Sequence, residues 1–421
     1  MKTTQTVRKV EMIVVQSSFA CEPLRGSEPE VGWRWMLEMS KYHEIVVLTR
    51  SNNQQVIEDY LKNNPQLCNG VTFKYFDLGP IALTLKKRCN WLNWYYVLWQ
   101  WHARKKIRCL VREHKASLVH LVTFASFRYP VFLGKAGVPV VWGPVGGGET
   151  APLSLLFHRT RWRSCVKELI RNMATGFSSF FASTINPCSK GGGRVLVSTP
   201  RTQKILELKG IQCEIMPTIG LNEGEILCDE KIPTVENGLN FLFVGRLVVL
   251  KGIHLLLEAF SQANMINARL TIAGDGPELK HLKMLASKLG VSARVDFIGH
   301  VDKKAIHEIY SNHHVLVAPS LYESGGYMVL EAFSHKRPAI VLDVGGLALS
   351  VNEQCGIKVP IGSAKDVIEG LAKALLFYHN SPESICEHGA AAKIRSEAIY
   401  GWRSKAERMN TLYLSTIEDF P

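Results

Sequence analysis

Residues 318–332 read APSLYESGGYMVLEA, a short apolar run followed by a Gly-Gly turn and the start of a helical pattern. Strand-to-helix junctions of this kind build parallel sheets that are covered by helices on both faces. Ligands of such sheets bind outside the carboxyl ends of the strands, so we expect Glu323 in the loop and Glu331 in the helix to face one crevice. Gly325 and Gly326 expose backbone amides at the helix N-terminus, where a diphosphate binds well. Taken alone, two acids at this spacing also fit an ordinary solvated helix.

The same kind of junction recurs upstream. Residues 243–252, FVGRLVVLKG, place Arg246 and Lys251 directly after a strand, where the two cations can converge on a diphosphate and offset charge on a leaving group. The turns at 273–277, AGDGP, and at 297–300, FIGH, occupy the same strand-end position. One loop of this type carries little weight, but four of them together favour a site for a phosphorylated ligand.

Short apolar, β-branched runs alternate with helical patterns along the whole chain, which predicts an α/β protein with two doubly wound parallel sheets. In the first half we expect strands at 12–16, 45–49, 71–76, 118–121, 138–142 and 195–198. In the second half we expect strands at 241–244, 270–273, 295–298, 315–318 and 339–342. The polar segment 218–238, punctuated by Gly and Pro, separates the halves and is typical of a linker.

Length and composition set further bounds. The chain has 421 residues, 46% of them hydrophobic, and this exceeds the roughly 100 to 200 residues of one ordinary domain. No run reaches the roughly 18 apolar residues of a membrane-spanning helix, and the N-terminal apolar run is too short for a signal peptide. The ten cysteines are scattered without a C-x-x-C pair. We therefore expect two domains, with reduced thiols in the cytosol and neither a zinc site nor disulfides.

The net charge of +13 is concentrated in the first half of the chain. Residues 1–220 contain 30 Lys and Arg against 14 Asp and Glu, whereas the remainder is slightly acidic. Nucleic acid, an anionic membrane surface or a phosphate-bearing substrate would each explain a basic half. Because no zinc finger, RNP motif or similar signature is present, we expect no nucleic acid partner.

Together, these motifs resemble those of the retaining glycosyltransferases of family 4, whose GT-B fold consists of two facing Rossmann-like domains with a nucleotide-sugar cleft between them. The resemblance covers nearly the whole chain, including PAIVLDVGG at 338–346 and a terminal helix with Tyr400, Trp402 and Tyr413. It implies an acceptor-binding domain at 1–217, a linker at 218–238 and a nucleotide-sugar-binding domain at 239–399. The helix at about 400–421 would pack back on the first domain.

The resemblance also implies roles for single residues. By motif position these roles fall on Arg246 and Lys251 at the donor diphosphate, Glu323 against the donor sugar and Glu331 at the nucleotide ribose. The backbone around Gly299 and His300 would meet the nucleobase. The sequence departs from the family at Lys336, where glycine is usual. Because a lysine in a left-handed helix cap costs about 1 kcal/mol, we expect this turn to differ.

Two loops in the first half resemble a bacterial branch of the family that is associated with capsule, exopolysaccharide or O-antigen assembly. The first, FACEPLRGSE at 19–28, ends at a helix start, where the amides of Gly26 and Ser27 would approach the donor phosphates. The second, VWGPVGGGE at 141–149, carries Gly147 in a triple-glycine loop at a strand end. A purely structural role, in which glycine and proline form the turns at the strand ends, would also explain both loops.

His120 ends the strand SLVH, where related enzymes place a histidine in the cleft, and the resemblance implies a catalytic role for it. A histidine at a strand end is equally often a hydrogen-bonded packing residue. Both interpretations stay open at this point.

Residues 86–115 read KKRCNWLNWYYVLWQWHARKKIRCLVREHK, with four tryptophans, nine Lys or Arg and a single acid. Tryptophans between flanking cations are typical of a helix that lies in the interface of an anionic membrane. A second basic stretch at 159–171 supports the same surface. The alternative is a core helix whose apolar stripe packs on the N-terminal sheet, a stripe made of Trp91, Trp94, Tyr95, Leu98 and Trp101.

We expect a retaining hexosyltransferase that moves a sugar from a nucleotide-diphospho-sugar to a glycan acceptor, lipid-linked and destined for bacterial surface polysaccharide. The resemblance implies front-face transfer, in which the leaving phosphate accepts the acceptor's proton. No D-x-D motif stands in the expected position, so we expect no cofactor and no essential metal. The expected location is the cytoplasm, peripheral on the inner face of the cytoplasmic membrane. A nucleotide-sugar epimerase of the same fold and a non-catalytic polysaccharide-binding protein are the alternatives.

Overall fold

The computed structural model describes residues 12–89, 92–133, 136–160, 162–180, 192–222, 224, 232–235 and 238–420. These residues form two compact units. The first contains the described residues up to Gly148, those of 177–218 and those from Trp402 onward. The second contains residues 149–176 and the described residues of 219–401. The expected boundaries placed 149–176 in the first domain, whereas its apolar side chains are buried in the core of the second unit.

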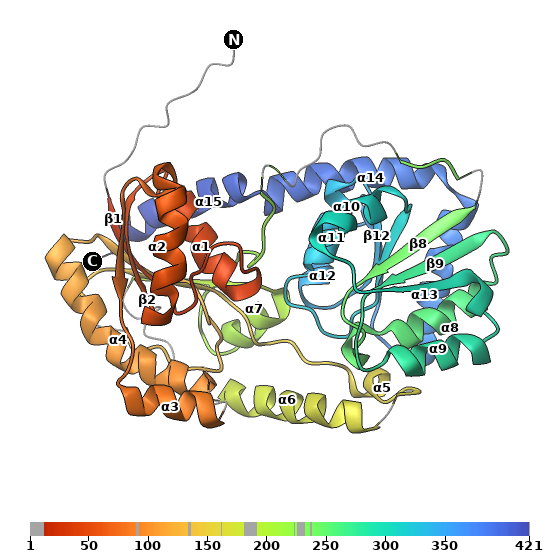
Figure 1. Cartoon of the computed structure of the whole chain (residues 1–421), viewed down its shortest axis with the longest axis horizontal. Helices are drawn as coiled ribbons and strands as arrows, with labels where there is room; N and C mark the ends of the chain where they lie inside the picture. Colours follow the sequence, from red (N-terminus) through yellow and green to blue (C-terminus); the bar gives the residue numbers. More distant parts are fainter. Residues whose placement is uncertain are drawn as a thin grey trace, which may run out of the picture. The chain divides into compact units, whose positions relative to one another are not determined.

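A parallel sheet in the order β3-β2-β1-β4-β5-β6-β7 forms the centre of the first unit (Figure 1). The strands are β1 (Ile13–Ser17), β2 (Glu44–Thr49), β3 (Val71–Tyr75), β4 (Leu118–Leu121), β5 (Val140–Val145), β6 (Arg194–Val197) and β7 (Glu214–Ile215). The helices are α1 (Ser27–Met39), α2 (Gln54–Asn63), α3 (Pro80–Cys89), α4 (Leu92–His114), α7 (Pro200–Glu207) and α15 (Trp402–Glu418). Short 3₁₀ turns cover Ser51–Asn53 and Pro65–Cys68.

Both faces of this sheet are buried. Successive residues of a strand point to opposite faces, so Val15 packs in one apolar cluster with α4 and Val14 packs in another with α1 and α15. Strands buried on both faces read as continuous apolar runs, which is why the sequence predicted them well.

A second parallel sheet, in the order β10-β9-β8-β11-β12-β13, forms the centre of the second unit. The strands are β8 (Leu239–Val244), β9 (Ala268–Ala273), β10 (Val295–Gly299), β11 (Val315–Ala318), β12 (Ala339–Leu342) and β13 (Gly356–Val359). The helices are α5 (Leu153–Leu156), α8 (Ile253–Ala263), α9 (Leu279–Lys288), α10 (Lys303–Ser311), α11 (Tyr327–Ser334), α12 (Gly345–Ser350), α13 (Ala364–Asn380) and α14 (Glu383–Arg395). Helix α6 (Trp162–Phe180) contributes its residues up to 176 to this unit.

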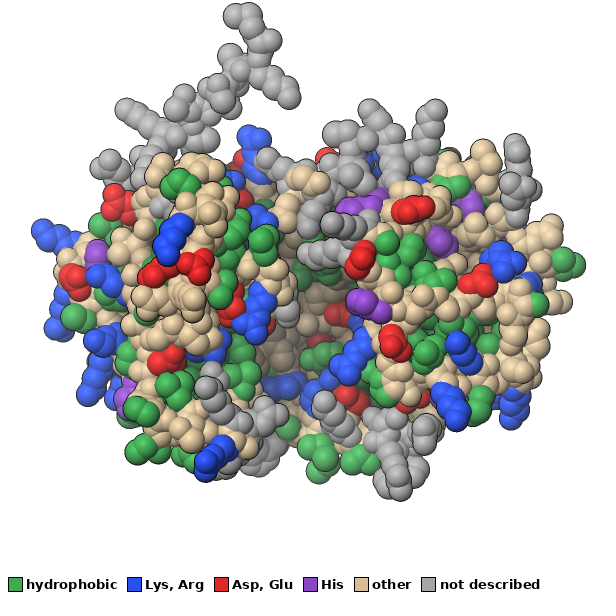
Figure 2. All heavy atoms as spheres, viewed as in Figure 1, with side chains coloured by type: hydrophobic (Ala, Val, Ile, Leu, Met, Phe, Trp, Pro, Cys, Tyr) green, Lys and Arg blue, Asp and Glu red, His purple; other side chains and the backbone are tan. Residues whose placement is uncertain are grey.

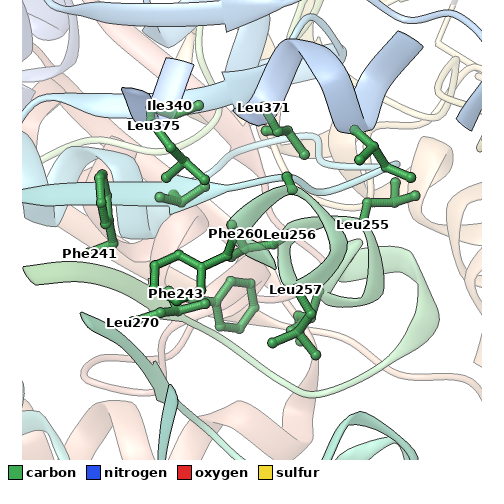
Figure 3. Close-up of a cluster of buried hydrophobic side chains, with 14 of the residues drawn as sticks. Phe241, Phe243, Leu255, Leu256, Leu257, Phe260, Leu270, Ile340, Leu371 and Leu375 are labelled. Carbon is green, nitrogen blue, oxygen red and sulfur yellow. The ribbon is translucent and has the colours of Figure 1, made fainter. Parts of the chain in front are cut away.

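Shorter elements complete the second unit. They are 3₁₀ turns at Val249–Lys251 and Ser292–Arg294 and a π-helical turn at Ser396–Tyr400. One face of the sheet is covered by α8, α9 and α13, and the other by α10, α11 and α12. Figure 3 shows the first of these two cores, in which Phe241 and Phe243 of β8 lie beside Phe260 of α8 and Leu375 of α13.

The predicted two-sheet α/β architecture is confirmed, and each expected strand is present within three residues of its predicted ends. Two edge strands were missed, the two-residue β7 and β13, whose sequence GIKV carries a glycine and a lysine. The expectation of a different turn at Lys336 is wrong, because this residue does adopt the left-handed conformation, with φ of 56°. None of the described helices is both long and apolar enough to cross a membrane.

Candidate active site

Lys251 and Glu323 meet in the second unit. Lys251 lies at the end of the 3₁₀ turn after β8, and Glu323 lies in the loop between β11 and α11. The distance from Lys251 Nζ to Glu323 Oε2 is 2.5 Å, and both side chains are mostly buried. Residues from two strand ends 72 positions apart therefore form one charged pair, at the edge of the sheet where ligands of this architecture bind.

Backbone contacts hold these two loops together. The Leu321 N–H donates to the Leu250 carbonyl oxygen at 2.7 Å. Gly252 has φ of 65°, and a Cβ added there would lie 2.0 Å from the Pro319 carbonyl oxygen. Only glycine allows both this conformation and this close approach, so Gly252 fixes Lys251 beside the Glu323 loop.

The loops after β8, β9 and β10 also touch one another. The Gly245 N–H donates to the Ala273 carbonyl oxygen at 2.9 Å, and the Gly274 N–H donates to the Gly299 carbonyl oxygen at 2.7 Å. Arg246 follows Gly245 with an exposed side chain and has no ion-pair partner among the described residues. His300 follows Gly299 and is exposed as well. The predicted strand-end residues of this unit thus lie on adjacent loops.

The Gly-Gly turn lies directly beside the charged pair. Gly326 precedes α11 with φ of 75°, and a Cβ added there would lie 3.7 Å from Glu323 Cγ. Gly325 lies against Ile219. The Glu323 carbonyl oxygen accepts a hydrogen bond from the Gly346 N–H at 2.9 Å. Two backbone hydrogen bonds, one at Leu321 and one at Glu323, therefore hold this loop.

Glu331 lies further along α11, on the side that faces α10. Its Oε2 accepts a hydrogen bond from the Tyr310 hydroxyl at 3.0 Å. Burial and the Glu331 carboxylate raise the pKa of Tyr310 well above its usual value, so this hydroxyl stays a donor. A cavity of about 90 Å³ adjoins the carboxylate and is lined by Leu221, Ile306, His307, Tyr310, Tyr327, Glu331, Ser334 and His335.

His120 occupies a different environment. It is fully buried in the first unit, where its Nε2–H donates to the Gly143 carbonyl oxygen at 2.9 Å. Its Nδ1 accepts from the Tyr413 hydroxyl of α15 at 2.6 Å. Burial lowers the pKa of His120 to about 4. Since both ring nitrogens are engaged and the ring is neutral, this geometry supports the packing interpretation and not a catalytic one.

This arrangement predicts a pH dependence of stability. The folded-state pKa of His120, about 4, lies below its ordinary value of 6.5, so its contribution is complete above pH 6.5 and is lost as pH falls toward 4. Between pH 7 and pH 5 we expect it to account for a loss of about 2 kcal/mol in the free energy of unfolding of the first unit. Urea unfolding followed by tryptophan fluorescence measures this loss, which His120→Asn should remove. An equal loss in the variant would assign the effect to other groups.

Gly26, Ser27 and Gly147 also belong to the first unit. Gly26 precedes α1 with φ of 69°, and a Cβ added there would meet open space. The side chain of Ser27 lies outside the described part of the chain. Gly147 has φ of 101°, and its carbonyl oxygen accepts from Arg128 Nε at 3.0 Å. The conformations of both glycines are those expected of tight strand-end loops.

Sequence reasoning missed Arg171 as a neighbour of the Glu323 loop. It belongs to the basic stretch expected to face a membrane, but in α6 its guanidinium lies 3.8 Å from the centre of the Tyr322 ring. Arg159, from the same stretch, lies 3.5 Å from Glu258 of α8. Side chains of Arg163 and Lys167 lie outside the described residues. The two described cations therefore contact the second unit, and only a three-dimensional structure reveals these pairings.

The basic aromatic segment forms α4 with an unexpected orientation. Its buried stripe contains Tyr95, Trp99 and Ile107, whereas Trp94 and Trp101 are 68% and 44% exposed. Trp91 lies outside the described residues. The alternative stripe proposed for core packing is therefore wrong for its members Trp94, Leu98 and Trp101, because the face that carries them points away from the sheet.

The comparisons with known proteins agree with this fold. Residues 228–389 match the family described as glycosyl transferases group 1. An uncharacterized glycosyltransferase of Methanocaldococcus jannaschii is 41% identical over 107 residues, which are 25% of this chain and 27% of that protein. The chain thus matches less than half the length of that relative.

Solved structures match over almost the whole chain. The lipopolysaccharide outer core galactosyltransferase WaaB has a TM-score of 0.64 at 15% identity and covers 96% of this chain and 99% of its own. The HepE protein of Anabaena, solved with UDP-glucose, has a TM-score of 0.56 at 14% identity and covers 96% of this chain and 100% of its own. At these identities the likeness shows the fold, which is GT-B.

Proposed function

We propose that this chain, whose residues 228–389 carry the glycosyl transferases group 1 match, transfers a sugar from a nucleotide-diphospho-sugar to a glycan acceptor. The observation that carries the proposal is the Lys251–Glu323 pair at the strand ends of the matched region. A cation and a carboxylate on glycine-shaped loops suit a donor that has a diphosphate on one side and a sugar on the other. The related fold of HepE was solved with UDP-glucose, which supports a donor of this class.

The proposed roles follow from charge and position. Lys251 and Arg246 bind the diphosphate and stabilise the charge that builds on it as the glycosidic bond breaks. When the donor binds, Lys251 exchanges its contact with Glu323 for the diphosphate, which leaves the carboxylate facing the sugar. Glu331, oriented by Tyr310, accepts hydrogen bonds from the ribose hydroxyls.

We extend the proposal to retention at the anomeric carbon, by front-face transfer in which the leaving phosphate accepts the acceptor's proton. The resemblance in the spacing of Glu323 and Glu331 supports this extension. We also propose that no metal is essential, because two side-chain cations supply the positive charge that a metal would otherwise provide.

The acceptor is proposed to be a lipid-linked glycan of bacterial surface polysaccharide, reached at the inner face of the cytoplasmic membrane. Support comes from the outer surface of α3 and α4. Ile81 is 80% exposed there and lines one groove with Leu85 and Leu98, and Trp94 and Trp101 of α4 are exposed as well. A groove of about 490 Å³ with an almost wholly apolar lining runs between α3 and α4. Exposed apolar surface of this kind marks an interaction site.

The cations of α4 favour an anionic bilayer as the partner of this surface. The Arg104 guanidinium lies 3.6 Å from the centre of the Trp101 ring, so a cation accompanies the exposed aromatic side chain. Lys105, Arg108 and Arg112 line a second groove along the same helix, together with Cys109 and one acid, Glu113. Figure 2 shows Lys and Arg side chains at the edge of the molecule formed by α4. Tryptophan at headgroup depth with adjacent cations is the arrangement of an interfacial helix.

Replacing Lys105 and Lys106 with glutamate should release the protein from anionic vesicles. Each surface Lys or Arg contributes on the order of 1 kcal/mol through a field that decays within a Debye length of about 8 Å. Sedimentation with vesicles of phosphatidylglycerol and phosphatidylcholine measures the effect, and binding should weaken as salt rises. Lys365→Glu and Lys373→Glu on α13 form the matched control. Binding that ignores lipid charge would contradict the membrane proposal.

A thermal-shift screen with UDP-, GDP- and ADP-glucose tests the donor class. We expect one nucleotide-sugar to raise the melting temperature, and we expect Glu331→Gln to reduce that shift, because a ligand that binds only the folded state stabilises it. Conversion of the donor to its epimer, with the nucleotide still attached, would indicate the epimerase alternative. Failure to release a nucleoside diphosphate with any acceptor would favour a non-catalytic polysaccharide-binding protein.

A further inference from the structure

Residues 149–176, here called the strap, lie between β5 and β6 of the first sheet in sequence but pack in the second unit. Their buried side chains Ala151, Leu155, Leu156 and Cys165 belong to the same apolar cluster as β8, α8 and α13. The strap is therefore part of the hydrophobic core that supports the strand ends of the candidate site.

Polar contacts fix the strap on α8 and α9. His158 Nε2 lies 2.9 Å from Glu258 Oε1, and His281 Nε2 lies 2.8 Å from the Arg159 carbonyl oxygen. Within the strap, Asn172 Nδ2 donates to the Ala151 carbonyl oxygen at 2.8 Å, and the Ala151 N–H donates to Asn172 Oδ1 at 3.2 Å. These bonds hold α6 at a defined place relative to the start of the strap.

The later part of the strap, in α6, contacts Tyr322, which is the residue next to Glu323. The Arg171 guanidinium stacks on Tyr322 at 3.8 Å from the ring centre, and its Nη2 lies 2.6 Å from Glu168 Oε2. Arg171 Nε and Nη2 are buried. A planar guanidinium that is paired on one edge and stacked on one face restricts the ring beneath it. Tyr322 in turn restricts the backbone that carries Glu323.

The start of the strap reaches a second segment that contacts the same loop. Glu149 is 4% exposed. A Cβ added to Gly345 would lie 3.1 Å from Glu149 Oε2 and 2.0 Å from the Glu323 carbonyl oxygen. Gly346 donates its N–H to that carbonyl oxygen. Glu149 therefore packs against the segment that is hydrogen-bonded to Glu323.

We propose that the strap positions Glu323, with Arg171 and Glu149 as positioning residues. The catalytic consequence rests on the proposed function, in which Glu323 lies against the donor sugar. The positioning itself is a property of the folded chain and is measurable without a substrate. Displacement of a reacting group by about 1 Å costs up to a hundredfold in rate, so loss of the strap contact should lower kcat by tenfold to a hundredfold.

The test uses the full chain and four variants. Arg171→Ala removes the stacking cation, and Tyr322→Leu removes the ring. Tyr322→Phe keeps the ring and is the conservative variant. Arg269→Ala is the matched control, because Arg269 pairs with Asp296 at 3.0 Å on an exposed part of the same unit. Melting temperatures and circular dichroism establish that each variant is folded, and Tyr322→Leu carries the test if Arg171→Ala does not fold.

Two measurements are made on each variant. Hydrogen–deuterium exchange of peptides that cover 319–326 reports the order of the loop without substrate. Turnover is measured as release of nucleoside diphosphate from whichever of UDP-, GDP- or ADP-glucose the thermal-shift screen identifies, with a membrane lipid extract as the source of acceptor. We expect Arg171→Ala and Tyr322→Leu to exchange faster in this loop and to lose kcat, with KM and nucleoside diphosphate affinity unchanged. Tyr322→Phe and Arg269→Ala should behave as the wild type.

The outcomes separate the two proposals. Unchanged hydrogen–deuterium exchange at 319–326 in Arg171→Ala and Tyr322→Leu would overturn the strap proposal. Faster exchange with unchanged kcat would overturn it as well. A loss confined to KM would also overturn it, because the strap is proposed to act on the position of Glu323 and not on donor binding. If the wild type turns over no donor, the proposed function fails, and the exchange result alone decides whether the strap orders the Glu323 loop.

Discussion

Lys251→Ala is expected to lower kcat by about a hundredfold to a thousandfold, the usual cost of removing one group that stabilises developing negative charge. The diphosphate gains charge as the glycosidic bond breaks, so the lysine contributes more in the transition state than in the ground state. The structure places Lys251 Nζ 2.5 Å from Glu323 Oε2, which is within the site where this charge would develop. Initial rates of nucleoside diphosphate release give kcat and KM separately.

The ion pair adds a second reason for a large effect. Without Lys251, the mostly buried Glu323 carboxylate loses its cationic partner, and a charge left unpaired in such a site is costly. Lys365→Ala, on the exposed surface of α13, is the matched control and should turn over like the wild type. A change in KM with kcat intact would mean that the lysine only holds the substrate.

Glu331→Gln is expected to weaken nucleoside diphosphate binding by about 1.5 to 3 kcal/mol, the value of a hydrogen bond to a charged group. This corresponds to a dissociation constant roughly 10 to 150 times larger. The amide keeps the shape of the side chain and can still accept from Tyr310, so the fold should be preserved. Isothermal titration of the nucleoside diphosphate that the screen identifies measures the difference.

Glu369→Gln provides the control for this substitution, since Glu369 is a carboxylate on the surface of α13 that pairs only loosely with Lys365 at 3.9 Å. Wild-type affinity in a folded Glu331→Gln variant would remove Glu331 from the ribose site. The cavity beside Tyr310 and His335 would then need another occupant.

Most of the fold could be predicted from the sequence because strands buried on both faces leave long apolar runs. The rule that ligands bind outside the carboxyl ends of parallel strands also placed Lys251 and Glu323 at one edge of the sheet. In the structure their side chains form an ion pair. The edge strand β13 was missed because an exposed edge needs no apolar run, and Lys358 within it is solvent-facing. Patterns report burial, so a short edge strand with a solvent-facing lysine is hard to find, whereas the edge strands β3 and β10 were predicted from their apolar residues.

Side-chain roles depended on partners that are distant in sequence. His120 pairs with Tyr413, 293 residues away, and that contact supports the packing interpretation. Arg171 lies in the strap, in the first half of the sequence, and it stacks on Tyr322 in the second half. No local pattern encodes either contact.

The orientation of α4 could not be predicted for a different reason. Aromatic residues occur around the whole circumference of this helix, so its periodicity does not choose a buried face. Tyr95 and Trp99 are buried because they pack on Phe19 of the first unit, which leaves Trp94 and Trp101 outside.

In the proposed function, the chain transfers a sugar and releases a nucleoside diphosphate. The most direct measurement incubates the protein with the donor found by thermal shift and a membrane lipid extract of the source organism, and quantifies both products by mass spectrometry. We predict equal amounts of nucleoside diphosphate and of lipid gaining one hexose, with both lost in Lys251→Ala. Intact nucleotide-sugar after prolonged incubation with active wild-type protein, or an epimerised sugar still joined to its nucleotide, would contradict the account.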